Sequence, residues 1–346
     1  MRQETPDIVI TGLAAISSAG VGIEPLTAAL CSGKSCLTPV QTELAGREGL
    51  YWGKAEAFKA ADFMPPLKAR KFDRCSLLAV VATGQALAAA GIAKGALEPA
   101  RVGITMGCGF GGINNSEEFL TGYFLKGVEG LTPMLFPNTV ANAAASNASI
   151  EHRLQGPNVT TVQRFCSAEN AFHLACRFLV EGRADVMVTG GVDEVTPRML
   201  QGFRALHQDR TYAGGYAEGC GLLVLERRDH AEARGATILG AVAAIRTVGQ
   251  LVAGREAEAI AKLLPQSPPA RIGLSGTADL WPLLVASLPP APVQNLAPIT
   301  GRAIAMGGLA LAALVATLPA GAAGLHLAAS PEGPYFAVSL RGGDSA

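Results

Sequence analysis

The clearest pattern of apolar and polar positions runs from residue 156 to residue 192. A β-branched run, Val159–Val162, predicts a strand, and an apolar run at residues 186–189 predicts a second strand. Between them the apolar period changes from two to 3.6 near Cys166, which predicts a helix and places Phe165 and Cys166 at a strand-to-helix elbow. Enzymes often hold a nucleophile at such an elbow, because the helix N-terminus favours a thiolate.

The same reading predicts alternating strands and helices along the rest of the chain. The second half repeats the first: the strand at 271–274 corresponds to the one at 101–106, and the helix at 302–318 with the strand at 324–328 corresponds to the elbow helix and its strand. Two such halves predict a layered α/β fold with a boundary near residues 230–237. Further strands are expected at 7–12, 219–226, from 237 and at 335–340, and helices near 22–32, 72–92 and 227–234.

Composition narrows the possible partners and compartments. Lys and Arg together number 28 and so do Asp and Glu, so no basic field is available for nucleic acid or an anionic membrane. The hydrophobic content of 49% means that much apolar surface must be hidden in the core or against a partner. Because no apolar run has the pattern of a membrane span and the N-terminus lacks a leader pattern, we expect a cytoplasmic protein. The seven cysteines contain no CxxC pair and predict free thiols rather than a metal site; Cys31 and Cys36 are expected in the core.

Three local patterns leave alternatives open. Gly107, Gly109 and Gly112 match the bare spacing of a dinucleotide-binding loop, although a close backbone approach in a packed interior is favoured. Residues 113–150 form an insertion rich in Asn, Ala and Ser, which is typical of close packing at an interface. On the elbow helix, Glu169, His173 and Arg177 recur every four residues and share a face, which indicates a buried or interface network more than catalysis.

Six segments carry a joint signature along nearly the whole chain: residues 9–20 (VITGLAAISSAG), 72–92, 102–118 (VGITMGCGFGGINNSEE), 131–158, 182–195 (GRADVMVTGGVDEV) and 218–238. Together they resemble the β-ketoacyl synthases of fatty acid and polyketide synthesis, which have the thiolase fold. The resemblance implies a layered αβαβα architecture, with an N-terminal ketosynthase-like half at 1–232 and a shortened C-terminal half at 233–346.

The resemblance also implies an active site with a nucleophilic cysteine at the elbow. We set the register on Gly156-Pro157 before the elbow and on Gly182-x-Ala184-Asp185 after it. Without a gap between these anchors, Phe165 occupies the nucleophile position and Cys166 follows one residue later. A phenyl ring cannot be acylated.

The helper groups that the family places around its cysteine are altered as well. Ser275-Gly276-Thr277 stands where the family has its first His-Gly-Thr, and Ala297 replaces the lysine. Arg302 follows Thr300-Gly301 in place of the second histidine, as a salt-bridging replacement or as a contact for the phosphate of a carrier's phosphopantetheine. The glycine-rich loop near the C-terminus is reduced to SPEGP at 330–334.

This pattern is similar to that of the chain-length factors, non-catalytic subunits that pair with an active ketosynthase and help to shape its acyl tunnel. It implies a catalytically silent protein, which forms a heterodimer or heterotetramer with an active β-ketoacyl synthase in polyketide, aryl polyene or fatty-acid-like biosynthesis. No bound cofactor is expected, because substrates arrive on the phosphopantetheine of an acyl carrier protein.

Phe110 and Phe165 are the predicted tunnel residues, with Phe110 either a core residue or a tunnel stopper. The phenylalanine at the elbow departs from the glutamine common in chain-length factors. Two alternatives stay open: an acyltransferase, condensing or hydrolytic enzyme that uses Cys166 as a shifted nucleophile, and a self-dimerising scaffold or acyl-binding protein.

Overall fold

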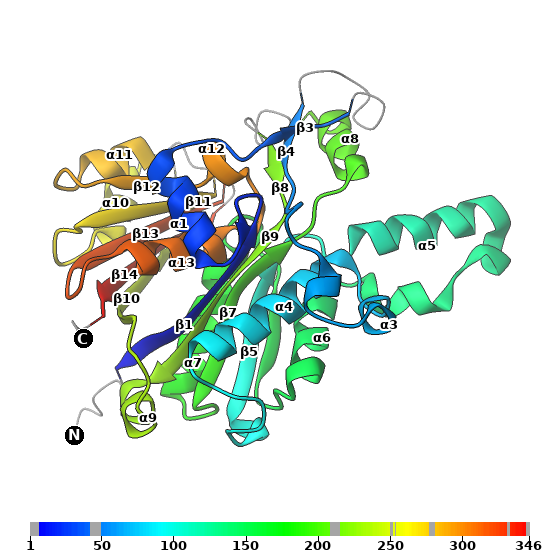
Figure 1. Cartoon of the computed structure of the whole chain (residues 1–346). Helices are drawn as coiled ribbons and strands as arrows, with labels where there is room; N and C mark the ends of the chain where they lie inside the picture. The colour runs from blue at the N-terminus through cyan, green and yellow to red at the C-terminus, as the bar shows by residue number, and fades with distance from the viewer. Residues whose placement is uncertain are drawn as a thin grey trace.

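The computed structural model describes residues 7–41, 50–207, 215–249, 252, 254–276, 281–330 and 333–343. These residues form an 11-stranded mixed sheet (Figure 1). Its main path in spatial order is β12 (Val293–Asn295), β11 (Arg271–Gly276), β13 (Ala323–Ala329), β14 (Tyr335–Gly342), β10 (Gly240–Val248), β1 (Ile8–Ser17), β9 (Gly219–Arg227), β7 (Val186–Asp193), β5 (Val102–Cys108) and β6 (Asn158–Thr161), with β2 (Gly20–Val21) paired to β1.

The strand order is symmetric about the antiparallel pair of β1 and β10. In the first half β5 pairs with β6 and β7 in parallel, and β9 joins β7 and β1 antiparallel. In the second half β11 pairs with β12 and β13 in parallel, and β14 joins β13 and β10 antiparallel. The expected pseudo-repeat is therefore confirmed at the level of strand pairing.

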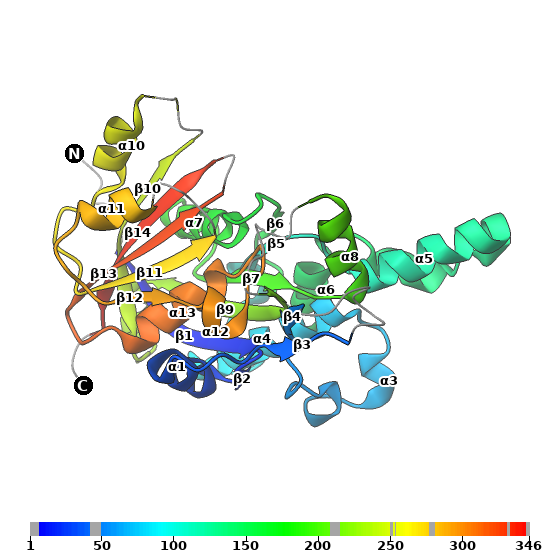
Figure 2. The same ribbon diagram turned by 90° about the horizontal axis from the view of Figure 1, so that it is seen from above.

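Helices complete five layers. α7 (Ser167–Val180) and α13 (Gly307–Thr317) pack between the two halves of the sheet and share a core with β1, β7, β9 and β14. α4 (Arg74–Ala89) and α6 (Ala143–His152) cover the outer face of the first half. α10 (Glu256–Leu263) and α11 (Trp281–Ala286) cover that of the second half (Figure 2). The expected layered αβαβα architecture is confirmed.

Glycines let the central helices approach the strands closely. A Cβ on Gly107 of β5 would lie 2.3 Å from the backbone N of Ala168 in α7, and one on Gly221 of β9 would lie 2.2 Å from that of Leu309 in α13. Such spacing is open only to glycine. The glycine cluster after β5 thus has the packing role favoured from the sequence.

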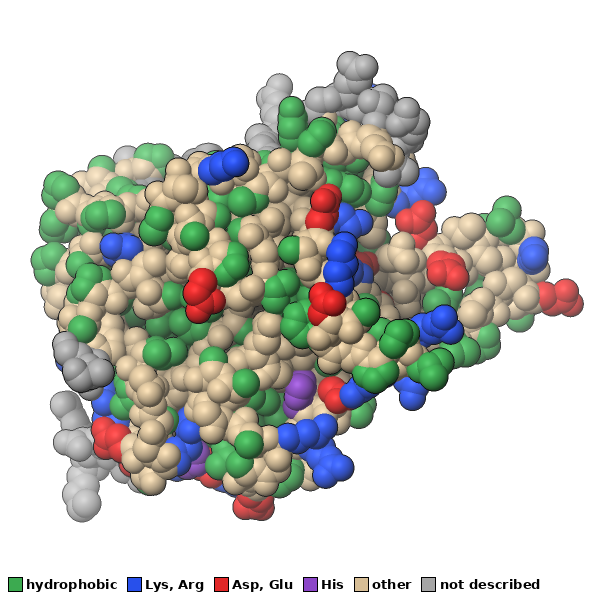
Figure 3. Space-filling view, viewed as in Figure 1, with side chains coloured by type: hydrophobic (Ala, Val, Ile, Leu, Met, Phe, Trp, Pro, Cys, Tyr) green, Lys and Arg blue, Asp and Glu red, His purple; other side chains and the backbone are tan. Residues whose placement is uncertain are grey.

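The insertion forms an arm that extends away from the layered body (Figures 1 and 2). It consists of α5 (Ile113–Lys126) and the 3₁₀ turns η3 (Gly127–Gly130) and η4 (Pro133–Asn138), and it leads into α6. No residue of α5 is buried. Large apolar side chains are exposed along the arm (Figure 3), namely Leu120, Tyr123, Phe124, Leu125, Val128, Met134, Phe136 and Val140.

Smaller elements complete the described part of the structure. β3 (Thr38–Pro39), β4 (Tyr51–Gly53) and β8 (Tyr216–Ala217) form a three-stranded sheet. The remaining helices are α1 (Ile23–Ser32), η1 (Ala60–Asp62), α3 (Pro66–Ala69), η2 (Pro99–Arg101), α8 (Pro197–Ala205), α9 (Arg228–Ala233) and α12 (Ala297–Thr300). Within the described residues, no helix is both long and apolar enough to span a membrane.

Two expectations for the N-terminal segment are wrong. The first strand does not end at Gly12 but runs to Ser17, because Gly12 allows α4 to pack against the strand: a Cβ there would lie 2.3 Å from the carbonyl oxygen of Ala86. Cys31 is exposed and Cys36 is half-buried, so neither is a core residue. Both lie at or beyond the end of α1, outside its packed face.

Candidate functional site: the elbow at Phe165

The elbow lies between the end of β6 at Thr161 and the start of α7 at Ser167. Arg164 adopts a left-handed conformation with φ 49°, which reverses the chain. The Ser167 hydroxyl ties the turn, since its Oγ accepts from the backbone N of Gln163 at 2.8 Å and donates to the carbonyl of Arg164 at 2.7 Å. The predicted elbow is confirmed, and its turn is held by these internal hydrogen bonds.

Phe165 points into a closed apolar cluster. It is 1% exposed and packs with Phe203 of α8, Tyr216 of β8 and Ile304. A Cβ on Gly276, at the end of β11, would lie 2.9 Å from the Cβ of Phe165. The position that the family resemblance assigns to the nucleophile therefore holds a packed hydrocarbon ring.

Cys166 is fully buried, and its thiol donates to the carbonyl oxygen of Pro334 at 3.2 Å. Burial raises the pKa of this thiol far above its usual range, and the nearby Glu169 carboxylate raises that pKa further. The nearby N-terminus of α7 does not offset this rise in the pKa of the thiol. Cys166 is therefore a protonated core thiol, which is the opposite of an activated nucleophile.

Glu169 forms a buried cluster with Ser275, which the sequence analysis named, and with His326, which it did not name. Its Oε1 accepts from the Ser275 hydroxyl at 2.6 Å and lies 2.8 Å from Nε2 of His326 on β13. Ser275 Oγ and His326 Nε2 are 3.3 Å apart. Because serine and carboxylate meet the same ring nitrogen, the three groups cannot act as a serine-histidine-acid relay, which needs the acid on the other nitrogen.

His173 and Arg177, which share the predicted face of the elbow helix with Glu169, are less buried than Glu169. His173 is half-buried with its ring edge-on to Phe336 at 6.4 Å, and burial lowers its pKa, with Arg177 lowering it further. Arg177 is exposed and pairs with Glu181 at 3.1 Å. The structure thus joins Glu169 to Ser275 and His326 rather than to a single network along its own helix.

Two further positions at which the chain departs from the family pattern, Ala297 and Arg302, are buried or half-buried. Ala297 is buried at the start of α12. Arg302 is half-buried, which lowers its pKa, and its backbone bonds to Gly215 and Ala217 at 2.9 and 2.7 Å attach this segment to β8. Thr277 and residues 331–332 of the SPEGP segment lie outside the described residues. In the described part of that segment, the backbone N of Gly333 donates to Ser330 at 2.8 Å.

Phe110 lies in the turn after β5, at the root of the arm. Its side chain is 40% exposed, and its ring contacts Phe203 with centroids 5.8 Å apart. Phe203 in turn contacts Tyr216 at 5.1 Å. The three rings form a row from the molecular surface to the cluster that holds Phe165.

A buried aspartate, which sequence reasoning did not single out, connects this turn to the second half. Asp193 accepts from the backbone N of Gly109 at 2.7 Å and from that of Ala305 at 2.6 Å. Burial raises its pKa to about 7 despite these bonds. No sequence signal marks this role, because its partners are backbone groups 84 and 112 residues away.

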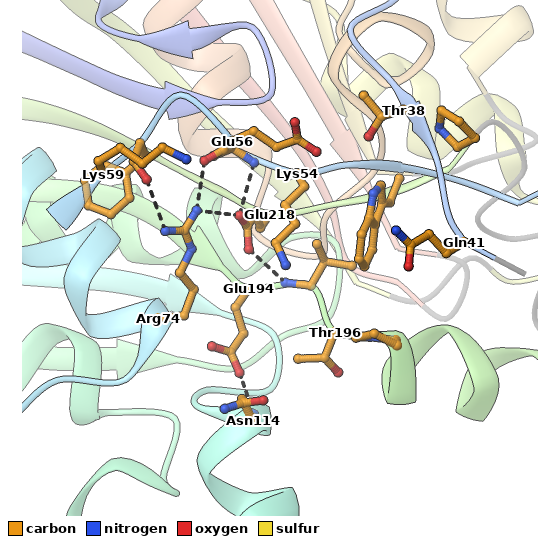
Figure 4. Close-up of a pocket in the computed structure, with 16 residues that line it drawn as sticks. Thr38, Gln41, Lys54, Glu56, Lys59, Arg74, Asn114, Glu194, Thr196 and Glu218 are labelled. Carbon is orange, nitrogen blue, oxygen red and sulfur yellow. Dashed lines mark hydrogen bonds and ion pairs between the residues drawn. The ribbon is translucent and has the colours of Figure 1, made fainter. Parts of the chain in front are cut away.

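A cavity lined mainly by polar and charged side chains lies next to the apolar cluster around Phe165 (Figure 4), and Phe165 is not among its lining residues. Its volume is about 710 Å³, and Trp52 and Val195, which line it, also belong to the cluster around Phe165. Arg74 and Glu218 pair across its wall at 2.7 Å. Glu194 accepts from the backbone N of Asn114 at 2.7 Å, and burial raises the pKa of its carboxyl to about 7.

Comparison with known proteins agrees with this architecture. Residues 5–231 match the family described as "Beta-ketoacyl synthase, N-terminal domain", which is more than half of the chain. The fold and the elbow thus define a condensing-enzyme scaffold of the thiolase type. The chain belongs to the β-ketoacyl synthase family.

Individual relatives are consistent with the family. The chain is 34% identical over 264 residues to "3-oxoacyl-[acyl-carrier-protein] synthase 2" of Rhizobium meliloti, covering 68% of this chain and 62% of that protein. It is 33% identical over 255 residues to "Nodulation protein E" of Rhizobium leguminosarum bv. trifolii, covering 70% and 63%. The chain thus spans a little over three fifths of the length of these curated relatives.

Solved structures share the fold over almost the entire chain. "The ishigamide ketosynthase/chain length factor" has a TM-score of 0.83 at 23% identity, with 97% of this chain and 99% of that chain covered. A structure of AntDE with the type II polyketide synthase acyl-carrier protein AntF has a TM-score of 0.84 at 20% identity, with 98% and 99% covered. At these identities the likeness concerns the fold alone.

Proposed function

We propose that the chain is a catalytically silent, chain-length-factor-type subunit, which pairs with an active β-ketoacyl synthase and helps to shape the tunnel for its acyl chain. The observation that carries the proposal is Phe165: an intact elbow presents a buried phenyl ring where the family's register places its cysteine. Cys166 offers no substitute, because its thiol is buried and protonated.

An apolar, unpaired edge supports the proposed pairing. β6 pairs only with β5 among the described strands and forms one end of the sheet. Ile150 and Val162 flank this edge with 76% and 59% exposure. Together with the apolar side chains on the arm, they are the candidate contacts for a partner subunit.

Phe110 is the proposed contribution to the acyl tunnel. Its ring packs against Phe203 and lies at the root of the arm, so a partner bound along the arm would meet the exposed side of the ring. The acyl chain would be brought to the partner by the phosphopantetheine of an acyl carrier protein, since the named synthase relatives act on carrier-protein substrates. This chain would then supply shape rather than chemistry.

Co-expression with an active β-ketoacyl synthase from the same genome tests the proposal. We expect a stable complex of equal stoichiometry by light scattering, with the isolated chain self-associated or poorly soluble. A partner-free, soluble monomer that binds no such synthase would contradict the proposal. A stable homodimer that does not bind the synthase would instead indicate a scaffold protein.

A further inference from the structure

A second cavity lies on the far side of the first half-sheet from the elbow, between the C-terminal ends of α4 and α6. Its volume is about 680 Å³, which is within the range that holds small-molecule ligands. The floor is apolar and is made of Leu87, Ile92, Leu97, Val102 and Leu154. We call this cavity the α4–α6 groove; none of the elbow residues lines it.

The wall on the α4 side is built from small residues. Gly84 and Ala88 line the groove along the helix, and Gly91 ends it in a left-handed conformation with φ 70°. A Cβ on Gly84 would lie 2.9 Å from Cε1 of His152, so this glycine makes room for the imidazole.

The rim of the groove is cationic. Glu151 is the one acidic lining residue, and it already pairs with both Lys68 and Lys94. Lys94 also donates to the backbone carbonyl of Glu151 at 2.9 Å. Arg153 is exposed and makes no ion pair with a described side chain, so two cations, Lys94 and Arg153, line the groove beside one carboxylate that Lys68 also neutralises from outside the lining. The charge left over favours an anionic group at the mouth.

His152 adds a polar wall without adding charge. Its Nε2 lies 2.8 Å from the carbonyl oxygen of Val80 and donates to it, which leaves Nδ1 as an acceptor. Burial lowers the pKa of this imidazole, so the ring is neutral near pH 7. The groove therefore combines an apolar floor with a cationic mouth.

We propose that the α4–α6 groove binds a small amphiphilic anion, a medium-chain carboxylate whose apolar tail lies over Leu87 and Leu154 and whose head pairs with Arg153 and Lys94. Neither the elbow nor a partner subunit takes part in this binding. The site is therefore independent of the function proposed above and is tested separately.

Calorimetric titration of the full chain with octanoate, 1-octanol and octylamine tests the site, because the three probes share a tail and differ in charge. We expect octanoate to bind and octylamine to bind at least about tenfold more weakly. Ala88→Leu fills the α4–α6 groove from an exposed helix position and should weaken octanoate binding at least about tenfold. Ala89→Leu, at the next exposed position but outside the groove, is the matched control and should bind as the wild type does.

Replacing Arg153 and Lys94 tests whether they bind the carboxylate head of octanoate. Arg153→Asn tolerates the left-handed backbone at φ 58°, and combined with Lys94→Gln it should reduce octanoate binding to the level of 1-octanol. Both changes are on the surface, so this variant remains informative even if Ala88→Leu fails to fold. Absence of octanoate binding, equal binding of octylamine, or octanoate affinity unchanged in the double variant would each overturn the proposal.

Discussion

At the residue scale, the chemistry of the elbow depends on two adjacent side chains. Phe165 has no reactive group, and Cys166 has one that burial keeps protonated. The sequence locates both residues at the elbow, because the change of apolar period is a local signal. It does not reveal His326, Ser167 or Asp193, whose roles come from contacts between segments far apart along the chain.

Thiol labelling measures the state of Cys166 directly. In the native protein at pH 7 we expect iodoacetamide to modify the exposed Cys31 and to leave Cys166 unmodified, as read by peptide mass spectrometry. In denaturant both should react. Rapid labelling of Cys166 in the native protein would show that the thiol is accessible and ionised. It would then support the hypothesis that Cys166 acts as a shifted nucleophile.

Glu194 gives the protein a pH-dependent stability. Its folded-state pKa of about 7 lies above the ordinary 4.5, so the free energy of unfolding falls as the pH rises from about 4.5 to 7, where the folded protein has to ionise a buried carboxyl. Glu194→Gln keeps an acceptor for Asn114 and removes this ionisation. We expect it to be more stable than the wild type by on the order of 2 kcal/mol at pH 8 and nearly equal at pH 4.5, by urea unfolding. An equal difference at both pH values would contradict the buried, titrating carboxyl.

At the element scale, the strands and helices follow their sequence periods closely, and the exceptions have steric causes. Gly12 resembled a strand end but is a packing position under α4. The helix expected at 302–318 begins at Gly307, because the preceding residues are bonded to β8 and to Asp193. A local pattern does not contain such tertiary contacts.

The start of α13 offers a sharp test of this packing. A Cβ at Gly307 would lie 2.0 Å from Oε1 of Glu169, so Gly307→Ala should break the buried cluster with Ser275 and His326 and cost about 2 kcal/mol or more of unfolding free energy. Gly202→Ala in α8 is the control, since nothing lies within 4 Å of its Cβ, and it should be neutral or stabilising. Equal stability of the two variants would show that the cluster tolerates displacement.

The arm is the element expected to carry partner recognition. Leu125 on α5 and Leu67 on α3 are 75% and 77% exposed, so a charge at either position should leave the melting temperature unchanged. We expect Leu125→Asp to weaken the complex with the ketosynthase at least about tenfold, because it buries a charge in an apolar contact. Leu67→Asp should bind normally. Equal affinities, measured by surface plasmon resonance, would exclude the arm from the interface.

At the scale of the whole molecule, the strands follow a mirrored order about β1 and β10, and packing contacts hold the two halves of this scaffold together. The central helices, the contact of Gly221 with Leu309 and the buried bonds of Asp193 join the two halves, and none of these contacts needs a reacting group. The family and the layered fold were predictable from motifs spread along the chain. The proposed division at 232/233 and the heterodimer remain predictions.

The most direct test of the account is the condensation activity of the complex purified with an active ketosynthase. We predict that Cys166→Ala in this chain leaves the rate unchanged, whereas replacement of the nucleophilic cysteine in the partner abolishes it. Loss of activity on Cys166→Ala, with the complex still assembled, would show that this chain performs the chemistry and would contradict the account.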